Sequence, residues 1–406
     1  MNKCLNKIGL LVFSLLLIGL LAACNGDSDP QTNGVDNGAN EEQDQGPTQK
    51  IGVQIYDATD SELIAFRRYY QDYIEDNYNV EFLFSDSLDT AEAERTSTEN
   101  FINQGVAAII SFSDSDRMSV IQMTEDAGVY YAIGAGTLSD EQLDMLSDNE
   151  YFVGSIGPSL AEEEEVGYDM AKHYIEQGYT NFLLYAGGYP FVDMHLMRTH
   201  GMIRALEEVG VTYNAREDGQ IGTFESDEYT INTVYGFPDD SGAFFGTVAE
   251  RVNEPGLEVI LTAGLGVEFF GTALAQSGQD IRMGTVASFE DAYYEGFSAG
   301  QVDYLAGKFS SSIGPIFAAV YNAINGDMEV VRNNGNPFRI DQGYWIATNV
   351  DEFNEMYEMS NSTENPAYTK ELLDMVIKSE NPDTDYDNFE SFVQSYSFDE
   401  ITNLQD

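Results

Sequence analysis

Residues 106–112 (VAAIISF) and 129–133 (VYYAI) are two short, nearly continuous apolar runs, and the polar stretch 113–128 (SDSDRMSVIQMTEDAG) separates them. Runs of this length, rich in β-branched and aromatic residues, predict strands that are buried on both faces. The stretch between them predicts a helix over 117–126. A strand, a helix and a second strand in this order are typical of a parallel sheet covered by helices.

The same alternation extends along the chain in both directions. Further strands are predicted at 51–56, 80–84, 182–186, 259–262 and 283–287, and further helices at 61–77, 91–104, 163–177, 194–209, 242–252 and 267–277. Two successive arrays of similar length predict an α/β fold with two similar, doubly wound parallel-sheet lobes. Because ligands of such sheets bind at the carboxyl ends of the strands, we expect one site between the two lobes.

The N-terminus carries the features of an export signal. Lys3 and Lys7 precede the apolar run 8–21, and Leu21-Ala-Ala-Cys24 ends it with small residues and a cysteine. This ending resembles the lipobox of bacterial lipoproteins. It implies a signal peptide over 1–23 and a diacylglycerol on Cys24 that holds the chain to the cell membrane, outside the cytoplasm. The alternatives are a transmembrane helix, which needs about 20 apolar residues, and an ordinary secretory signal, which needs no cysteine.

The composition excludes some partners. Residues 24–49 are polar, without apolar periodicity, and predict a disordered acidic tether. The chain has 70 Asp and Glu against 18 Lys and Arg, a formal net charge of −52. Such a surface repels nucleic acid, so we expect no nucleic-acid partner. The acidic residues are scattered along the chain, which favours adaptation to a saline or alkaline habitat over a patch that binds a cationic ligand or partner.

The sequence contains no set of residues that is typical of a catalytic or metal site. Cys4 and Cys24 are the only cysteines, so the exported domain has no disulfide, thiol nucleophile or cysteine metal site. His195 and His200 are five residues apart, about 140° around a helix, and do not share a face. Neither a phosphate-binding glycine loop nor a Gly-x-Ser-x-Gly motif occurs. We therefore expect no enzyme activity, no cofactor and no metal.

Two pairs of polar residues directly follow predicted strands. Asp114 and Asp116 come after the strand at 106–112, and Tyr56 and Asp57 come at the end of the strand at 51–56. At these positions they are candidates to bind the hydroxyl groups of a ligand. The alternative for each pair is a helix N-cap, because Asp is a preferred capping residue.

The lipobox, the polar tether and the two strand–helix arrays together resemble the type I periplasmic binding proteins, the ribose-binding-like solute receptors of bacterial ABC importers. The resemblance extends from residue 50 onward. Its more specific landmarks are the opening strand 51–56, Arg198-x-x-Gly201 and the segment 300–307 (GQVDYLAG). It implies a hinge of three crossings between the lobes.

The resemblance also implies where the hinge divides the chain. The three crossings are expected near Gly154–Pro158, Ser288–Asp291 and Arg339–Gly343. The N-terminal lobe would comprise 50–156 and 290–340. The C-terminal lobe would comprise 157–289 and 341–406, including a tail extension from about residue 366 whose role the sequence does not reveal.

The resemblance further implies ligand-binding positions and partners. Arg198 matches an arginine that reaches the ligand, and Lys308 matches a polar contact beside the hinge. Nucleoside receptors related to the family use aromatic stacking, for which the candidates are Phe112, Tyr189, Phe191 and Phe289. The family's usual acidic positions are replaced by Ala135-Gly136, Leu265-Gly266 and Ser288. The implied protein is a monomer that binds a small polar ligand, a sugar or sugar-like molecule, and delivers it to the permease subunits of an ABC importer. The alternatives are a nucleoside receptor, a sensory subunit for a membrane kinase or chemoreceptor, and a surface hydrolase.

Overall fold

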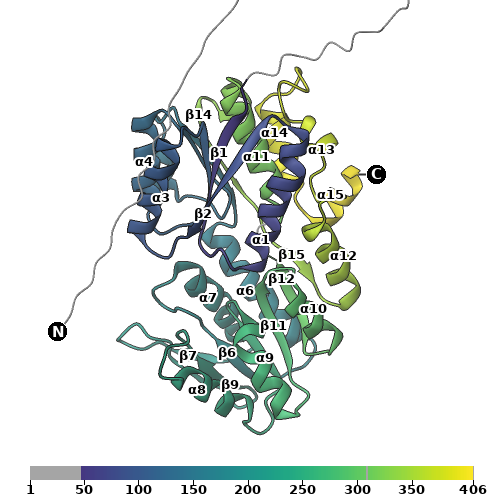
Figure 1. Cartoon of the computed structure of the whole chain (residues 1–406). Helices are drawn as coiled ribbons and strands as arrows, with labels where there is room; N and C mark the ends of the chain where they lie inside the picture. Colours follow the sequence, from purple (N-terminus) through teal and green to yellow (C-terminus); the bar gives the residue numbers. More distant parts are fainter. Residues whose placement is uncertain (1–46, 308–309, 406) are drawn as a thin grey trace, which may run out of the picture. The chain divides into compact units, whose positions relative to one another are not determined.

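The computed structural model describes residues 47–307 and 310–405. Within these residues the chain forms two parallel sheets, each covered by helices (Figure 1), and a small two-stranded sheet. We call each large sheet with the helices that pack on it a lobe. The predicted α/β fold with two doubly wound lobes is confirmed.

The first sheet has seven strands, and only its first pair is antiparallel. In order across the sheet the strands are β13 (Arg332–Asn333), β14 (Asn336–Asp341), β5 (Phe152–Gly157), β4 (Tyr130–Ile133), β3 (Ala108–Phe112), β1 (Gln49–Ile55) and β2 (Val80–Ser87). Its helices are α1 (Ser61–Arg68), which continues through a π-type turn (Tyr69–Ile74) into α2 (Glu75–Asn77), α3 (Ala91–Asn103), α4 (Arg117–Ala127), α5 (Asp140–Met145) and α11 (Ile313–Ile324).

The second sheet has six strands, and only the pair of β12 with the edge strand β15 is antiparallel. The order is β15 (Trp345–Ala347), β12 (Val302–Gly307), β11 (Arg282–Ala287), β10 (Val259–Thr262), β6 (Asn181–Tyr185) and β9 (Thr230–Val234). Its helices are α6 (Leu160–Glu176), α7 (Asp193–Glu208), α8 (Ala243–Val252), α9 (Gly266–Ser277), α10 (Asp291–Ser298) and α12 (Val350–Asn361). The hairpin of β7 (Thr212–Asn214) and β8 (Thr223–Glu225) follows α7.

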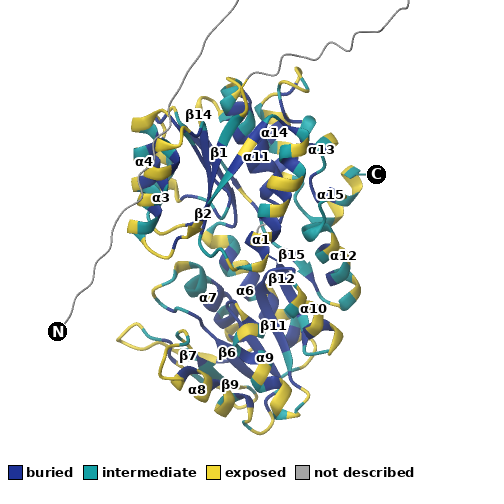
Figure 2. Ribbon diagram, in the orientation of Figure 1, coloured by how far each residue is buried: buried dark blue, intermediate teal, exposed yellow. Residues whose placement is uncertain are grey.

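The apolar runs that predicted central strands are buried throughout. Every residue of β3, β5 and β10 is buried, and Figure 2 shows both sheets dark blue beneath helices with exposed outer faces. Such strands are stabilised by about 25 cal/mol for each Å² of apolar surface removed from water. The hydrophobic effect therefore fixes both sheets as the inner layers of the lobes.

Two glycines allow α6 and α7 to approach each other closely. A Cβ atom on Gly201 would lie 1.9 Å from the carbonyl oxygen of Glu164, and one on Gly167 would lie 2.0 Å from that of Arg198. The predicted landmark Arg198-x-x-Gly201 therefore has a packing reason, because only glycine at residue 201 permits this contact.

The predicted second crossing at Ser288–Asp291 is wrong. After β11 the chain continues through α10 into β12, which pairs in parallel with β11, Gly284 opposite Tyr304. The chain leaves the second sheet only after Gly307. Residues 290–307 therefore belong to the second lobe and not to the first. The chain leaves the first sheet after Gly157 and again after Asp341, within the other two predicted ranges.

The C-terminal extension also differs from the prediction, which placed it with the second lobe. Its helices α13 (Lys370–Asp374) and α14 (Tyr386–Gln394) pack on elements of the first lobe: α13 on α11, and α14 on β14 and the 3₁₀ helix at Met328–Val331. A last helix, α15 (Phe398–Gln405), follows. Among the described helices, none is long and apolar enough to cross a membrane.

Candidate functional site

Exposed aromatic side chains gather on loops at the carboxyl ends of the second sheet. The loops after β6 and β9 are held together by a hydrogen bond of 2.7 Å from the Gly236 N–H to the carbonyl oxygen of Gly187. A Cβ atom on Gly188 would lie 3.0 Å from the ring of Phe237, so the absence of a side chain there lets this ring lie over the backbone. Phe237 is 47% exposed and Phe191 83% exposed. This edge of the sheet therefore presents open aromatic faces.

His195 and Leu265 complete this edge. The Nδ1 atom of His195 accepts the N–H of Gly188 at 3.0 Å, and its ring centroid lies 5.8 Å from that of Phe237. Leu265, directly after β10 and its neighbouring Ala263-Gly264, is 39% exposed and has a φ of 54°. Leucine in this left-handed conformation is strained, and such strain is concentrated at functional sites. The sequence pattern had marked Leu265 only as a departure from the family.

Tyr189 packs against Tyr213 of the β7–β8 hairpin. It packs with Ala186 and Ile221 in a small apolar cluster and is 9% exposed. Burial, together with the hydrogen bond to Tyr213, raises the pKa of the Tyr189 hydroxyl to about 12. In this conformation Tyr189 anchors its own loop to the β7–β8 hairpin through Tyr213. Its contact with a ligand stays a prediction.

Arg198 is held in a buried ion pair. Its Nε donates to Glu163 Oε2 at 2.6 Å and its Nη2 to Glu163 Oε1 at 3.2 Å. Its Nη1 donates to the carbonyl oxygen of Ala263 at 2.7 Å, and its Nη2 also to the Tyr344 hydroxyl at 3.2 Å. Within the described residues, one Nη1–H is left for a ligand. Burial acts to lower the pKa of Arg198, but Glu163 and Tyr344 outweigh it and the pKa is raised.

On the first lobe, Tyr56 and Asp57 are engaged with their own loop. The Tyr56 hydroxyl donates to Asp60 Oδ2 at 2.6 Å, while Asp60 Oδ1 accepts the N–H groups of Glu62 and Leu63 and caps α1. Asp57 Oδ1 accepts the Thr59 N–H at 2.8 Å and the Thr59 hydroxyl at 2.7 Å. The helix cap is therefore Asp60, and Asp57 orders the turn that precedes it.

The pair Asp114 and Asp116 is divided between two environments. Asp116 forms an ion pair with Arg95, and its Oδ1 accepts the Ser119 hydroxyl at 2.7 Å. Its N–H donates to Glu94 Oε2 at 2.6 Å, and it occupies the N-cap position of α4, although its side chain bonds no N–H group of that helix. Asp114 is exposed. Because β1 and β3 are adjacent and parallel, Ile55 opposite Phe112, the loops of Asp57 and Asp114 lie at the same edge.

Carboxyl groups of the two lobes meet near the loop after β11. The Ser288 hydroxyl donates to Glu62 Oε2 at 3.2 Å. Burial raises the pKa of Glu290 to about 7. The nearby carboxylates Glu268 and Asp60 also raise it, whereas a hydrogen bond with Ser61 lowers it. A protonated Glu290 donates to the neighbouring Glu268, whose Oε2 accepts the Tyr293 hydroxyl at 2.7 Å. The contact between the lobes thus includes a carboxyl group that titrates near neutral pH.

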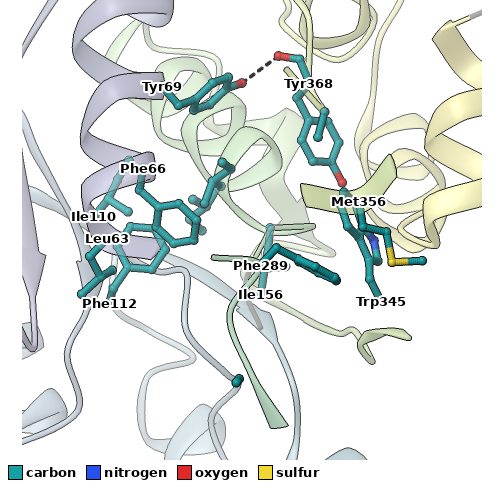
Figure 3. Packing of buried hydrophobic residues seen from close by; sticks show 14 of the residues in the cluster. Leu63, Phe66, Tyr69, Ile110, Phe112, Ile156, Phe289, Trp345, Met356 and Tyr368 are labelled. Atoms are coloured by element: carbon teal, nitrogen blue, oxygen red, sulfur yellow. Dashed lines mark hydrogen bonds between the residues drawn. The ribbon is translucent and has the colours of Figure 1, made fainter. Parts of the chain in front are cut away.

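Phe289 offers no open face in this structure. It is 3% exposed, and its ring centroid lies 5.7 Å from that of Phe353 and 6.2 Å from that of Trp345. Figure 3 shows it inside an apolar cluster that includes Leu63 and Phe66 of the first lobe. Phe289 therefore contributes to the apolar core, and the rings it packs against, Phe353 and Trp345, belong to the second lobe. The predicted ligand contact at Lys308 and the predicted lipid site at Cys24 lie outside the described residues.

No described group of three or more His, Cys, Asp and Glu is arranged to hold a metal ion. A hollow of about 570 Å³ runs along β2 and α3 of the first lobe, where Phe84 and Phe101 lie among hydroxyl and amide side chains. It reaches Ser87, whose hydroxyl bonds the N–H of Ala58 at 2.8 Å beside the Asp57 loop.

No family model and no curated protein match this chain. Solved structures do match. They include a solute-binding protein of an ABC transporter from Bacillus halodurans C-125 with bound myo-inositol (17% identity, TM-score 0.54, 78% of this chain and 99% of that chain). The arabinose-transporter binding protein of Shewanella sp. ANA-3, with bound L-arabinofuranose, has 15% identity and a TM-score of 0.55 over 78% of this chain and 96% of that chain. A solute-binding protein of Actinobacillus succinogenes 130z with bound D-allose has 14% identity and a TM-score of 0.57 over 75% of this chain and 99% of that chain. The chain therefore has the fold of the type I periplasmic binding proteins, as the sequence resemblance implied.

Proposed function

We propose that this protein is a non-enzymatic solute receptor, held outside the cytoplasm by a lipid on Cys24. It captures a small polar ligand, a sugar or sugar-like molecule, between the carboxyl ends of its two sheets. It then delivers the ligand to the permease subunits of an ABC importer. The observation that carries this proposal is the edge of open aromatic rings, Phe191 and Phe237, at the strand ends of a fold shared with sugar-binding proteins.

The residues at the two edges suit a polyhydroxylated ligand. Aromatic faces pack against the C–H faces of a ring, while carboxylates accept its hydroxyl protons. Phe191 and Phe237 supply rings from the second lobe, and Asp57 and Asp114 supply carboxylates from the first. Arg198, with one remaining Nη1–H, supplies a donor beneath the loop after β10.

A thermal-denaturation screen tests the binding function. The panel contains pentoses, hexoses and inositols, with nucleosides and amino acids as the competing classes. A ligand at 100 times its Kd stabilises the folded state by about 2.7 kcal/mol. We expect a sugar or inositol to raise the Tm. Stabilisation by nucleosides alone would replace the ligand class, and a folded protein that no compound stabilises would contradict the receptor function.

Delivery to an importer is tested separately in cells. We expect deletion of the gene to reduce uptake of the stabilising ligand at concentrations near its Kd, and the intact gene to restore uptake. Unchanged uptake, together with a lost transcriptional or chemotactic response to that ligand, would instead identify a sensory subunit.

A further inference from the structure

The chain connects the two lobes a fourth time, beyond the three crossings of its hinge. Helix α12 packs on α10 and β15 of the second lobe, with the rings of Phe353 and Phe297 4.9 Å apart. The next helix, α13, lies on the first lobe, where the Tyr78 hydroxyl donates to Asp374 Oδ1 at 2.8 Å. Residues 362–369 therefore form an additional crossing. Figure 1 shows α12 beside α10, and α13 and α14 beside α11.

This fourth crossing is bonded to the second one. The Tyr368 hydroxyl donates to the carbonyl oxygen of Ser311 at 2.6 Å, and just before the crossing, at the end of α12, the Ser360 hydroxyl donates to the Ser310 hydroxyl at 3.0 Å. Tyr368 is 1% exposed and Ser311 6% exposed. On its other side Tyr368 accepts at its carbonyl oxygen from the Tyr69 hydroxyl of the first lobe, the bond drawn in Figure 3. The segment 310–312 thus cannot turn without disturbing the C-terminal segment.

The C-terminal segment is also bonded to the third crossing, residues 342–344. Gln342 is 1% exposed, and its Nε2 donates to the carbonyl oxygen of Val393 at 2.7 Å. Its Oε1 accepts the Ser311 hydroxyl at 3.1 Å, which joins the second and third crossings directly. Immediately after this crossing, the Trp345 indole donates to the carbonyl oxygen of Tyr396 at 2.7 Å.

The last helix, α15, contacts both the second sheet and the fourth crossing. The ring of Phe398 lies 5.4 Å from Trp345 of the second sheet. At the far end of α15, Gln405 Nε2 donates to the carbonyl oxygens of Pro366 and Ala367, both at 2.9 Å. Helix α15 therefore contacts the second sheet through its first turn and the fourth crossing through its last turn.

We propose that residues 362–405 are a brace that restricts rotation of the lobes about the hinge. Hinge residues must change φ and ψ when the lobes rotate. Here a rotation separates buried donors and acceptors at residues 311, 342 and 368 from their partners, and a buried polar group without a partner is unfavourable. The brace thereby narrows the range of lobe–lobe angles. This inference rests on the two-lobe fold and holds whichever ligand the protein binds.

Spin labels on the two lobes test the brace. Labels are placed at Glu99→Cys on α3 and Glu250→Cys on α8, both exposed, in a chain whose Cys4 and Cys24 are replaced by serine. The test variant, Tyr368→Phe with Ser360→Ala, removes both hydroxyls that reach the second crossing. The control, Tyr386→Phe with Ser395→Ala, removes hydroxyls of the same segment that bond Glu390 Oε1, the Asn333 side chain and the carbonyl oxygen of Ser391, none of which lies in a crossing.

We expect the test variant to broaden the distribution of distances between the labels by about 1.5-fold or more, because the crossings gain freedom to rotate. The control keeps the parent's distribution. Amide hydrogen exchange at residues 310–312 and 342–344 accelerates in the test variant by about tenfold. A test variant that matches the parent in both measurements would overturn the proposal, and so would a control that broadens as much as the test variant.

Discussion

The buried ion pair of Arg198 decides what a substitution there does. Both partners are almost fully buried, so removing the guanidinium leaves the Glu163 carboxylate without its counter-ion. Breaking such a pair is destabilising by about 3–5 kcal/mol, whereas replacing both partners by apolar residues is often neutral. We expect Arg198→Ala to lower the free energy of unfolding by about this amount, and Arg198→Met with Glu163→Leu to recover most of it. Urea denaturation measures both. Equal loss in the single and double variants would show that the pair is not the cause.

At Glu290 the structure predicts a dependence of stability on pH. The pKa of this carboxyl is about 7 in the folded chain against 4.5 in the unfolded chain, chiefly because it is buried. The folded state therefore binds more protons between these values, and stability falls as the pH rises from 4.5 to about 7. Because the group is partly exposed, we expect a loss of about 1–2 kcal/mol between pH 5 and pH 8.

Glu290→Gln is expected to remove that loss. Glu295→Gln, an exposed position on the same helix α10, provides the control and should retain it. Denaturation at the two pH values gives the comparison. The same slope in the parent and in Glu290→Gln would assign the pH dependence to another group.

Among the elements, the contact of α6 with α7 depends on a single missing Cβ atom. Alanine at Gly201 would bring its Cβ within 1.9 Å of the Glu164 carbonyl oxygen, so the two helices must separate. We expect Gly201→Ala to lower the free energy of unfolding by about 3 kcal/mol or more. Gly246→Ala on α8 meets no atom within 4 Å and should be stabilising by about 0.5–1 kcal/mol, because alanine favours a helix. Thermal denaturation of both variants checks this, and a Gly201→Ala variant as stable as the parent would contradict the close contact.

The sequence predicted strands and helices well where the apolar residues followed one clear pattern, either a continuous run or a helical period. The runs 51–56, 106–112 and 129–133 are strands because central parallel strands are apolar on both faces. Helix α11 was missed for a related reason. Its residues IGPIFAAVYNAI are apolar on nearly all sides and include Pro315 in the first turn, so they lack the polar face that marks a helix. Because neither β12 nor α11 was predicted, the second crossing was placed too early in the chain, before β12 instead of after it.

Site residues were harder to predict than elements. A sequence shows that Arg198 carries a guanidinium, but its partner Glu163 lies on another helix, 35 residues earlier in the chain. The same holds for Phe289, whose burial depends on Trp345 and Phe353 of a later segment. Phe237 had no motif to mark it, and Leu265 was marked only as a departure from the family, because the strained backbone and the exposure of Leu265 emerge only from the fold.

For the whole molecule, the proposed lipid on Cys24 predicts where the protein is found. We expect the parent to be in the membrane fraction and to incorporate a labelled fatty acid. Cys24→Ser should shift it to the soluble or uncleaved precursor fraction without incorporation, because only a cysteine thiol accepts the diacylglycerol. Cys4→Ser is the control and should behave as the parent. Labelling of the Cys24→Ser variant would contradict the anchor.

We propose that one small ligand binds at the aromatic edge of the second lobe, where Phe237 is exposed. Calorimetric titration with the sugar or inositol that raises the Tm measures the number of ligands bound and their affinity. The titration compares the parent with Phe237→Ala and with the control Met375→Ala. The Met375 side chain is 46% exposed and that of Phe237 47%. We expect one ligand per chain, affinity about tenfold weaker in Phe237→Ala because a stacking face is lost, and no change in Met375→Ala. Equal affinity in the parent and in Phe237→Ala would place the ligand elsewhere and contradict the proposed site.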